Sequence, residues 1–250
     1  MNASRTGSAP RPTPAKSSVR SVWIFAVLTA MAAGFVGLAL YLIFAVAPVE
    51  ARMGIVQKIF YFHVPAGMAM VMLAGGCAVL SLLFLVKRKE LFDELAVAAA
   101  EATFVFATIA LITGPLWARK AWSGVWWTWD ARLTSTLLLW IVLVGYMMLR
   151  SLGGAGGRKY AAGLAVFAGV DAVLVYASVQ IWGGQHPIVM QEDGLGSNIH
   201  PDMRPALYAS MAAYFCIGAL LFWLRWGLER TRNRVRAVEL ELSARGVGEA

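Results

Sequence analysis

Three tryptophans, an aspartate and an arginine are concentrated within seven residues of this 250-residue chain: Trp126, Trp127, Trp129, Asp130 and Arg132. Indole rings can stack on a flat ligand, and a neighbouring carboxylate and guanidinium can pair with charged groups at the ligand's edge. Tryptophan is also enriched at membrane surfaces, which accounts for isolated rings such as Trp23 and Trp182. It does not account for three rings followed at once by two charged residues. This segment therefore predicts a platform for a planar ligand.

The chain has three histidines: His63, His186 and His200. Neutral imidazole is a common axial ligand of haem iron, and two histidines on opposite faces of a porphyrin would saturate the metal. One histidine near a membrane surface is more often a hydrogen-bonding bystander, but two that flank the tryptophans favour ligation. Zinc is the competing metal. It usually takes three or four protein ligands, so a zinc site would need His200 as well.

Six apolar stretches, each long enough to cross a bilayer, must position these residues. A membrane-spanning helix needs about 20 residues, and in hydrocarbon a helix satisfies its own backbone donors and acceptors. The stretches cover residues 22–47, 59–86, 96–113, 133–149, 160–182 and 206–226. With 59% hydrophobic and only 14% charged residues, the chain is predicted to be an all-α integral membrane protein with six transmembrane helices.

Lysine and arginine are distributed unequally between the two ends of the predicted helices. With the N-terminus inside, sixteen of the 22 basic residues fall on the cytoplasmic side and six on the outer side. This bias predicts cytoplasmic N- and C-termini, and it puts His63, His186 and a loop over residues 114–132 on the outer side. The net charge of +8 then reflects topology and anionic lipid, and it gives no reason to expect nucleic acid as a partner.

The predicted organisation has three parts. Residues 1–20 have too little apolar surface to fold and are expected to form a disordered basic tail. Residues 21–228 form the six-helix membrane domain, and residues 229–250 form a cytoplasmic C-terminal tail. Gly114 and Gly124 would let the outer loop fold back toward the membrane.

Several kinds of chemistry are not expected. Cys77 and Cys216 lie inside apolar stretches and belong to no C-x-x-C or C-x-x-C-H motif, so thiol chemistry and covalent haem attachment are disfavoured. No G-x-x-x-x-G-K-[ST] loop occurs, so any energy input must come from another subunit. Two acidic residues fall in predicted helices. Glu101 is expected to reach lipid headgroups, and Asp171, near mid-helix, is expected to make a structural polar contact.

The segment SGVWWTWDARLTS, from Ser123 to Ser135, resembles the tryptophan-rich "WWD" signature of the haem-handling cytochrome c assembly family. Chain length, six helices and the YFHVPA run from Tyr61 to Ala66 make the chain similar to the family's short branch, cytochrome c maturation protein C or haem exporter protein C. The similarity covers about residues 55–226. Ser123 separates Trp122 from Gly124, where the family's motif has them adjacent, so Trp122 is left out of the predicted site.

The resemblance implies a set of site residues. Members of the family hold haem b on the WWD platform, with two outer histidines as axial ligands of the iron. In this chain those ligands would be His63 and His186. The rest of the haem-binding set would be Trp117, Trp126, Trp127, Trp129, Asp130 and Arg132.

The resemblance also implies a place and a set of partners. Such a protein crosses the bacterial inner membrane several times, with its functional loops in the periplasm. It is not an enzyme: it presents haem and delivers it to a periplasmic haem chaperone, maturation protein E, during c-type cytochrome maturation. It works beside an ABC transporter formed by maturation proteins A and B, and beside a small single-helix protein, maturation protein D. A haem-lyase-like part in attaching haem to the chaperone stays open.

Three other functions also stay open on the sequence. The same aromatic pocket could belong to a quinone- or substrate-binding membrane enzyme. The chain could be a haem-handling subunit of a different cytochrome c assembly system, or a structural scaffold subunit. A b-type Soret band in the purified protein would separate haem binding from the enzyme and scaffold alternatives.

Overall fold

The computed structural model describes residues 16–183, 186, 190–191, 194–195 and 199–245. Its long helices are α1 (Lys16–Tyr41), α2 (Phe60–Lys87), α3 (Glu90–Ala121), α4 (Ala131–Leu152), α5 (Gly154–Trp182) and α6 (Arg204–Ala244). Shorter helical turns are η1 (Leu42–Val46), η2 (Ile55–Ile59) and η3 (Pro201–Met203). Two short strands, β1 (Met190–Gln191) and β2 (Gly194–Leu195), pair antiparallel. Within the described residues, six helices are long and apolar enough to cross a membrane, which confirms the predicted six-helix, all-α membrane fold.

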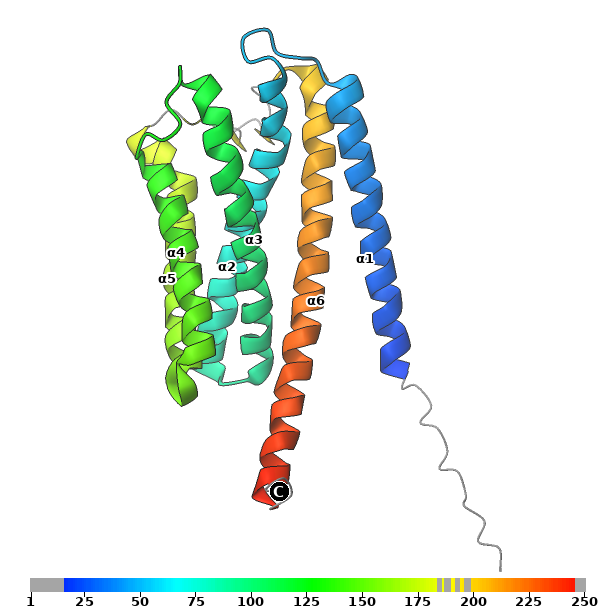
Figure 1. Cartoon of the computed structure of the whole chain (residues 1–250), viewed down its shortest axis with the longest axis vertical. Helices are drawn as coiled ribbons and strands as arrows, with labels where there is room; N and C mark the ends of the chain where they lie inside the picture. The colour runs from blue at the N-terminus through cyan, green and yellow to red at the C-terminus, as the bar shows by residue number, and fades with distance from the viewer. Residues whose placement is uncertain (1–15, 184–185, 187–189, 192–193, 196–198, 246–250) are drawn as a thin grey trace, which may run out of the picture.

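The helices form a bundle in which α2 and α3 lie between two flanking pairs (Figure 1). Helices α4 and α5 pack together on one side, while α6 contacts α3 and α2 on the other and carries α1. The start of α1 and the end of α6 point to the same end of the bundle (Figure 1). We call the opposite end, where α3 ends and α2 and α4 begin, the distal end.

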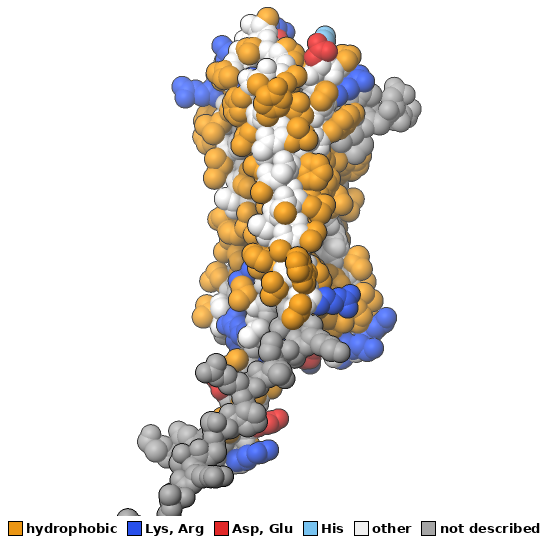
Figure 2. All heavy atoms as spheres, turned by 90° about the vertical axis from the view of Figure 1, so that its right-hand side faces the viewer, with side chains coloured by type: hydrophobic (Ala, Val, Ile, Leu, Met, Phe, Trp, Pro, Cys, Tyr) orange, Lys and Arg blue, Asp and Glu red, His pale blue; other side chains and the backbone are white. Residues whose placement is uncertain are grey.

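The surface of the bundle suits a lipid bilayer. Figure 2 shows hydrophobic side chains over the middle of the face on the α1 side, with Lys and Arg gathered near its two ends. This banding is expected where the middle of each helix contacts hydrocarbon and its ends contact headgroups.

Small residues let the helices of the core approach closely. The buried core is rich in alanine from α3 and α5. A Cβ atom added to Gly169 of α5 would lie only 2.2 Å from the Cβ of Ala78 in α2. Small residues are a usual means of bringing membrane helices together, where packing replaces the hydrophobic effect as the attraction between them.

A cluster of charged side chains ties four helices together near the end that carries the termini. Asp93 of α3 is 2% exposed and accepts hydrogen bonds from Arg150 of α4, at 2.7 Å, and from Arg158 of α5. Arg150 also pairs with Glu229 of α6 at 3.1 Å. Each buried carboxylate of this cluster therefore has a cationic partner, as charge burial requires.

The helices are longer than the apolar stretches predicted. Helix α3 continues through Pro115 to Ala121, and α4 starts at Ala131, so the connection between them is shorter than the loop expected over 114–132. Gly114 is therefore helical and does not act as a loop hinge. Helix α1 begins at Lys16, inside the expected tail, and α6 runs on to Ala244. Apolar runs mark where a helix meets lipid, whereas Arg, Lys and Glu continue a helix readily in water.

The two acidic residues within the predicted helices differ from expectation. Glu101 forms an ion pair with Arg225 of α6, so it pairs within the protein and does not simply reach the headgroups. Asp171 is 2% exposed, and neither of its carboxylate oxygens has a hydrogen-bond partner in the part of the chain that the structure describes. The polar contact expected for Asp171 is not found there.

Candidate functional site

His63 is held against α3 at the distal end of the bundle. It is the fourth residue of α2, and its Nδ1 lies 3.0 Å from the hydroxyl oxygen of Thr113 in α3. The next residue of α3, Gly114, leaves room for the ring, since a Cβ there would lie 3.1 Å from His63 Cε1. Two adjacent residues of α3 thus fix one edge of the imidazole.

His186 follows α5 in sequence and lies close to His63 in the structure. The two ring centroids are 6.5 Å apart, and the ring planes are inclined by 32°. Trp122 packs edge-on against His186 with ring centroids 5.3 Å apart. Asp130 Oδ2 lies 3.5 Å from His186 Nδ1. Burial lowers the pKa of His186 below its ordinary value; the nearby Arg132 adds to this effect and Asp130 opposes it.

Asp130 has a second task in the local fold. Its other carboxylate oxygen accepts a 2.8 Å hydrogen bond from the backbone N–H of Leu133, which caps the start of α4. Trp129, just before it, has the left-handed backbone conformation, with φ of 54°, that non-glycine residues seldom adopt. The strained turn therefore places Asp130 where one carboxylate oxygen caps α4 and the other lies near His186.

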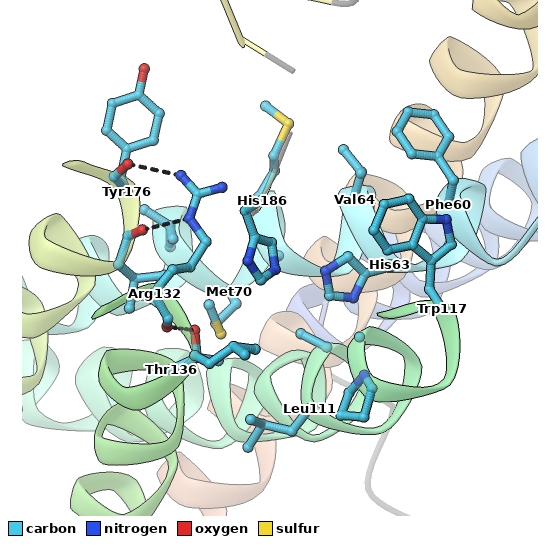
Figure 3. A pocket seen from close by; sticks show the side chains of 18 of the residues that line it. Phe60, His63, Val64, Met70, Leu111, Trp117, Arg132, Thr136, Tyr176 and His186 are labelled. Carbon is cyan, nitrogen blue, oxygen red and sulfur yellow. Dashed lines mark hydrogen bonds between the residues drawn. The ribbon is translucent and has the colours of Figure 1, made fainter. Parts of the chain in front are cut away.

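The two histidines face an open cavity of about 300 Å³ lined by α2, α3, α4 and α5 (Figure 3). Its walls are mainly apolar and include Met70, Val71, Leu111 and Leu133. The side chains that can form polar contacts are His63, His186, Arg132, Gln180, Thr136, Tyr176 and Trp117. An apolar cavity with a few polar groups is the usual form of a small-molecule or cofactor site.

Arg132 lines this cavity, and part of its guanidinium is already hydrogen-bonded to the backbone of α5. Its Nε donates to the carbonyl of Val175 and its Nη2 to the carbonyl of Tyr176, both at 3.1 Å. These bonds attach the start of α4 to the end of α5 (Figure 3). The guanidinium is thereby held beside His186 with two of its three nitrogens engaged.

The predicted tryptophans fall into two groups. Trp117 lines the cavity, with its Nε1 3.4 Å from Gln57 Oε1. Trp126, Trp127 and Trp129 are not among the cavity's lining residues and form a chain of ring contacts in the connection between α3 and α4. Trp126 and Trp129 are 60% and 70% exposed.

Trp122, which the sequence interpretation left out, contacts both His186 and Trp117. It ends α3 as the C-cap residue. The sequence analysis left Trp122 out of the site because Ser123 interrupts the family's motif. It did not predict that α3 extends to Ala121, which brings Trp122 to His186.

His200 is separate from this group. It caps η3, and its Nδ1 accepts a hydrogen bond from the backbone N–H of Asp202 at 3.4 Å. Its side chain is 65% exposed. Among the described residues no group of three or more His, Cys, Asp and Glu side chains could hold a metal ion. Within that part of the chain, the structure shows no third ligand of the kind that a zinc site would need beside His63 and His186.

The spacing of His63 and His186 fits an iron that needs only two ligands from the protein. A metal–imidazole bond is about 2 Å long, so two imidazoles on opposite sides of one metal have centroids about 6 Å apart. The observed separation is 6.5 Å. Haem supplies four equatorial nitrogens of its own and takes two axial ligands, so this pair suits haem better than a bare metal ion.

Comparison with known proteins supplies the family. A family model described as "Heme exporter protein C" matches residues 11–241. The chain is 32% identical over 194 residues to heme exporter protein C of Paracoccus denitrificans, which covers 76% of this chain and 80% of that protein. It is 33% identical over 203 residues to heme exporter protein C of Escherichia coli K12, covering 78% and 77% of the two chains.

The chain belongs to the haem exporter protein C family. A mitochondrial relative from Marchantia polymorpha, named for cytochrome c biosynthesis, is 29% identical over 189 residues, or 75% of this chain and 79% of the relative. The family match includes both cavity histidines of this haem exporter protein C family member, covers α1 to α5 and reaches residue 241 of α6. The family predicted from the WWD segment is confirmed.

Proposed function

We propose that this chain binds haem b between His63 and His186 and presents it at the periplasmic face of the bacterial inner membrane. The observation that carries this proposal is the pair of imidazoles, 6.5 Å apart, inside a mainly apolar cavity. The family supports it, since the relatives are named as haem exporters.

The residues of the cavity would have distinct roles. His63 and His186 would bind the iron from opposite faces of the porphyrin. Met70, Leu111 and other apolar side chains would cover part of the ring and exclude water. Arg132, at the cavity's edge, would pair with a propionate through the part of its guanidinium not bound to α5.

The WWD tryptophans would act outside the cavity. These tryptophans are not lining residues, so they would contact a part of the porphyrin that extends beyond the cavity. Trp126, Trp127 and Trp129, next to Asp130 in the same connection, would provide the outer stacking surface. Because Trp126 and Trp129 are mostly exposed, they would also form the face where haem leaves.

Delivery would be to a periplasmic haem chaperone, maturation protein E. Because its sequence contains no P-loop of its own, the chain would work with maturation proteins A and B of the ABC transporter. The family resemblance adds the single-helix maturation protein D. We assign the chain no catalytic step. Its residues would bind and orient haem.

Purified protein tests the proposal. Detergent-solubilised chain titrated with haem should give a six-coordinate, low-spin, b-type spectrum, and acid–organic extraction should remove all the haem. Trp117→Ala should weaken haem binding about 10-fold, because it removes part of the cavity wall worth about 1–3 kcal/mol. Trp23→Ala, on the exposed surface of α1, is the matched control and should leave binding unchanged. No low-spin haem, or a bound quinone in its place, would refute the proposal.

A further inference from the structure

The hydroxyl of Thr113 stands between two polar partners. Its Oγ1 donates to the backbone carbonyl of Ile109, one turn earlier in α3, at 2.6 Å. The same oxygen lies 3.0 Å from Nδ1 of His63. A threonine hydroxyl has a single proton, and a carbonyl oxygen can only accept. The proton of Thr113 therefore belongs to the bond with Ile109.

This assignment determines which ring nitrogen of His63 is protonated. Toward His63 the Thr113 oxygen can act only as an acceptor, so Nδ1 must carry the N–H. A neutral imidazole has one N–H, which leaves Nε2 with a free lone pair. Metal-binding histidines commonly use their second ring nitrogen in this way, and the outer partner sets the tautomer.

We infer that Thr113 is a positioning residue that holds His63 in the Nδ1–H tautomer and presents its unprotonated Nε2 for an axial bond to haem iron. The part of this inference that concerns iron rests on the proposed function. The part that concerns the tautomer rests only on the contacts among Ile109, Thr113 and His63.

Gly114 supports the same arrangement from the next position. A Cβ on Gly114 would lie 3.1 Å from Cε1 of His63, the ring atom between the two nitrogens. That distance is shorter than ordinary contact, so a side chain here would require the imidazole of His63 to shift by a few tenths of an ångström. The pair Thr113–Gly114 thus provides both the acceptor and the space that the imidazole needs.

Helix α3 contains a matched control. Thr108 donates its hydroxyl to the carbonyl of Phe104 at 2.8 Å and accepts a 2.9 Å bond from Nε1 of Trp140. It has the same residue type, helix and bonding pattern as Thr113, but its outside partner is an indole. Thr108→Val therefore reproduces the structural cost of Thr113→Val without touching a histidine.

The tautomer can be measured without haem. Nitrogen-15 NMR of ligand-free protein labelled at histidine, with the His63 signals identified by their loss in His63→Gln, reports which nitrogen is protonated. We expect the Nδ1–H tautomer in the wild type, Thr113→Ser and Thr108→Val. Thr113→Val should show a mixture of both tautomers. A wild-type His63 with Nε2–H, or a Thr113→Val spectrum equal to wild type, would overturn the inference.

Haem titration tests the part that concerns iron. Thr113→Val should lower haem affinity on the order of 10- to 100-fold and reduce the low-spin fraction, as loss of an outer partner of a metal-binding histidine does. Thr113→Ser and Thr108→Val should stay close to wild type. Unchanged haem affinity in Thr113→Val, despite an altered tautomer, would refute the role toward iron. If the wild type binds no low-spin haem, the proposed function fails, while the NMR result still decides the tautomer.

Discussion

At the scale of single residues, the two imidazoles of the cavity have different neighbours. His63 is set by a neutral hydroxyl and by the missing side chain of Gly114. His186 has an indole edge and the carboxylate of Asp130 beside it. A carboxylate near an imidazole raises its basicity more than a hydroxyl does. The two proposed ligands are therefore not equivalent, and His186 should respond more to charge.

This difference predicts a pH dependence. Burial lowers the pKa of His186 from 6.5, with Arg132 adding to the effect and Asp130 opposing it. A histidine with a lowered pKa stays neutral, and able to bind metal, to a lower pH than free imidazole. Low-spin haem should therefore persist on acidification through pH 6.5 and be lost only below it.

Replacing Asp130 by Asn tests the direction of this effect. The variant removes the charge that raises the pKa of His186, and it keeps a side chain able to cap α4. The pH at which low-spin haem is lost, followed by optical titration, should fall relative to wild type. A rise in that pH would contradict the electrostatic account of His186.

The residues of the cavity were only partly predictable. Four of the predicted haem-binding residues line it: His63, His186, Trp117 and Arg132. Thr113, which contacts His63 across 50 residues of chain, gave no signal in the sequence, because a threonine in an apolar stretch usually bonds only to its own helix.

At the scale of whole elements, α3 and α5 determine the shape of the site. The extension of α3 beyond the apolar stretch carries Trp117 and Trp122 to the histidines. Helix α5 supplies the carbonyls that hold Arg132, and it is fixed on α2 by the close approach of Gly169 to Ala78. The existence of the helices could be predicted from hydropathy. Their ends could not, since polar and aromatic residues continue α3 in water.

The packing of α5 can be tested with one pair of glycines. Gly169→Ala would bring two Cβ atoms within 2.2 Å, so α2 and α5 must separate, at a cost of about 1–3 kcal/mol. Gly163→Ala, in the same helix, meets nothing within 4 Å and should be neutral or slightly stabilising. Unfolding in detergent by titration with dodecyl sulfate should separate the two variants, and equal stability would argue against tight α2–α5 contact.

At the scale of the whole molecule, the cavity lies at the end opposite the two termini. The charged cluster around Asp93 links the helices near the end that carries the termini. If the positive-inside bias of the sequence sets the orientation, the distal end faces the periplasm. Only in this orientation would haem in the cavity be accessible to a periplasmic acceptor.

Cysteine labelling tests this orientation. In a chain with Cys77 and Cys216 replaced by Ala, Ser123→Cys, in the connection between α3 and α4, should react with an impermeant thiol reagent in intact spheroplasts. Ser151→Cys, exposed at the opposite end of α4, should react only after the membrane is opened. The reverse pattern would place both cavity histidines on the cytoplasmic side.

The central claim, that His63 and His186 hold haem iron together, is tested most directly by the spectrum of single glycine variants. His63→Gly and His186→Gly should each lose the low-spin spectrum and regain it with free imidazole, which can fill the space that each side chain leaves. His200→Gly should behave as wild type, because His200 lies at η3, outside the cavity lining. Retention of the low-spin spectrum in His63→Gly or His186→Gly without added imidazole, or its loss in His200→Gly, would contradict the account.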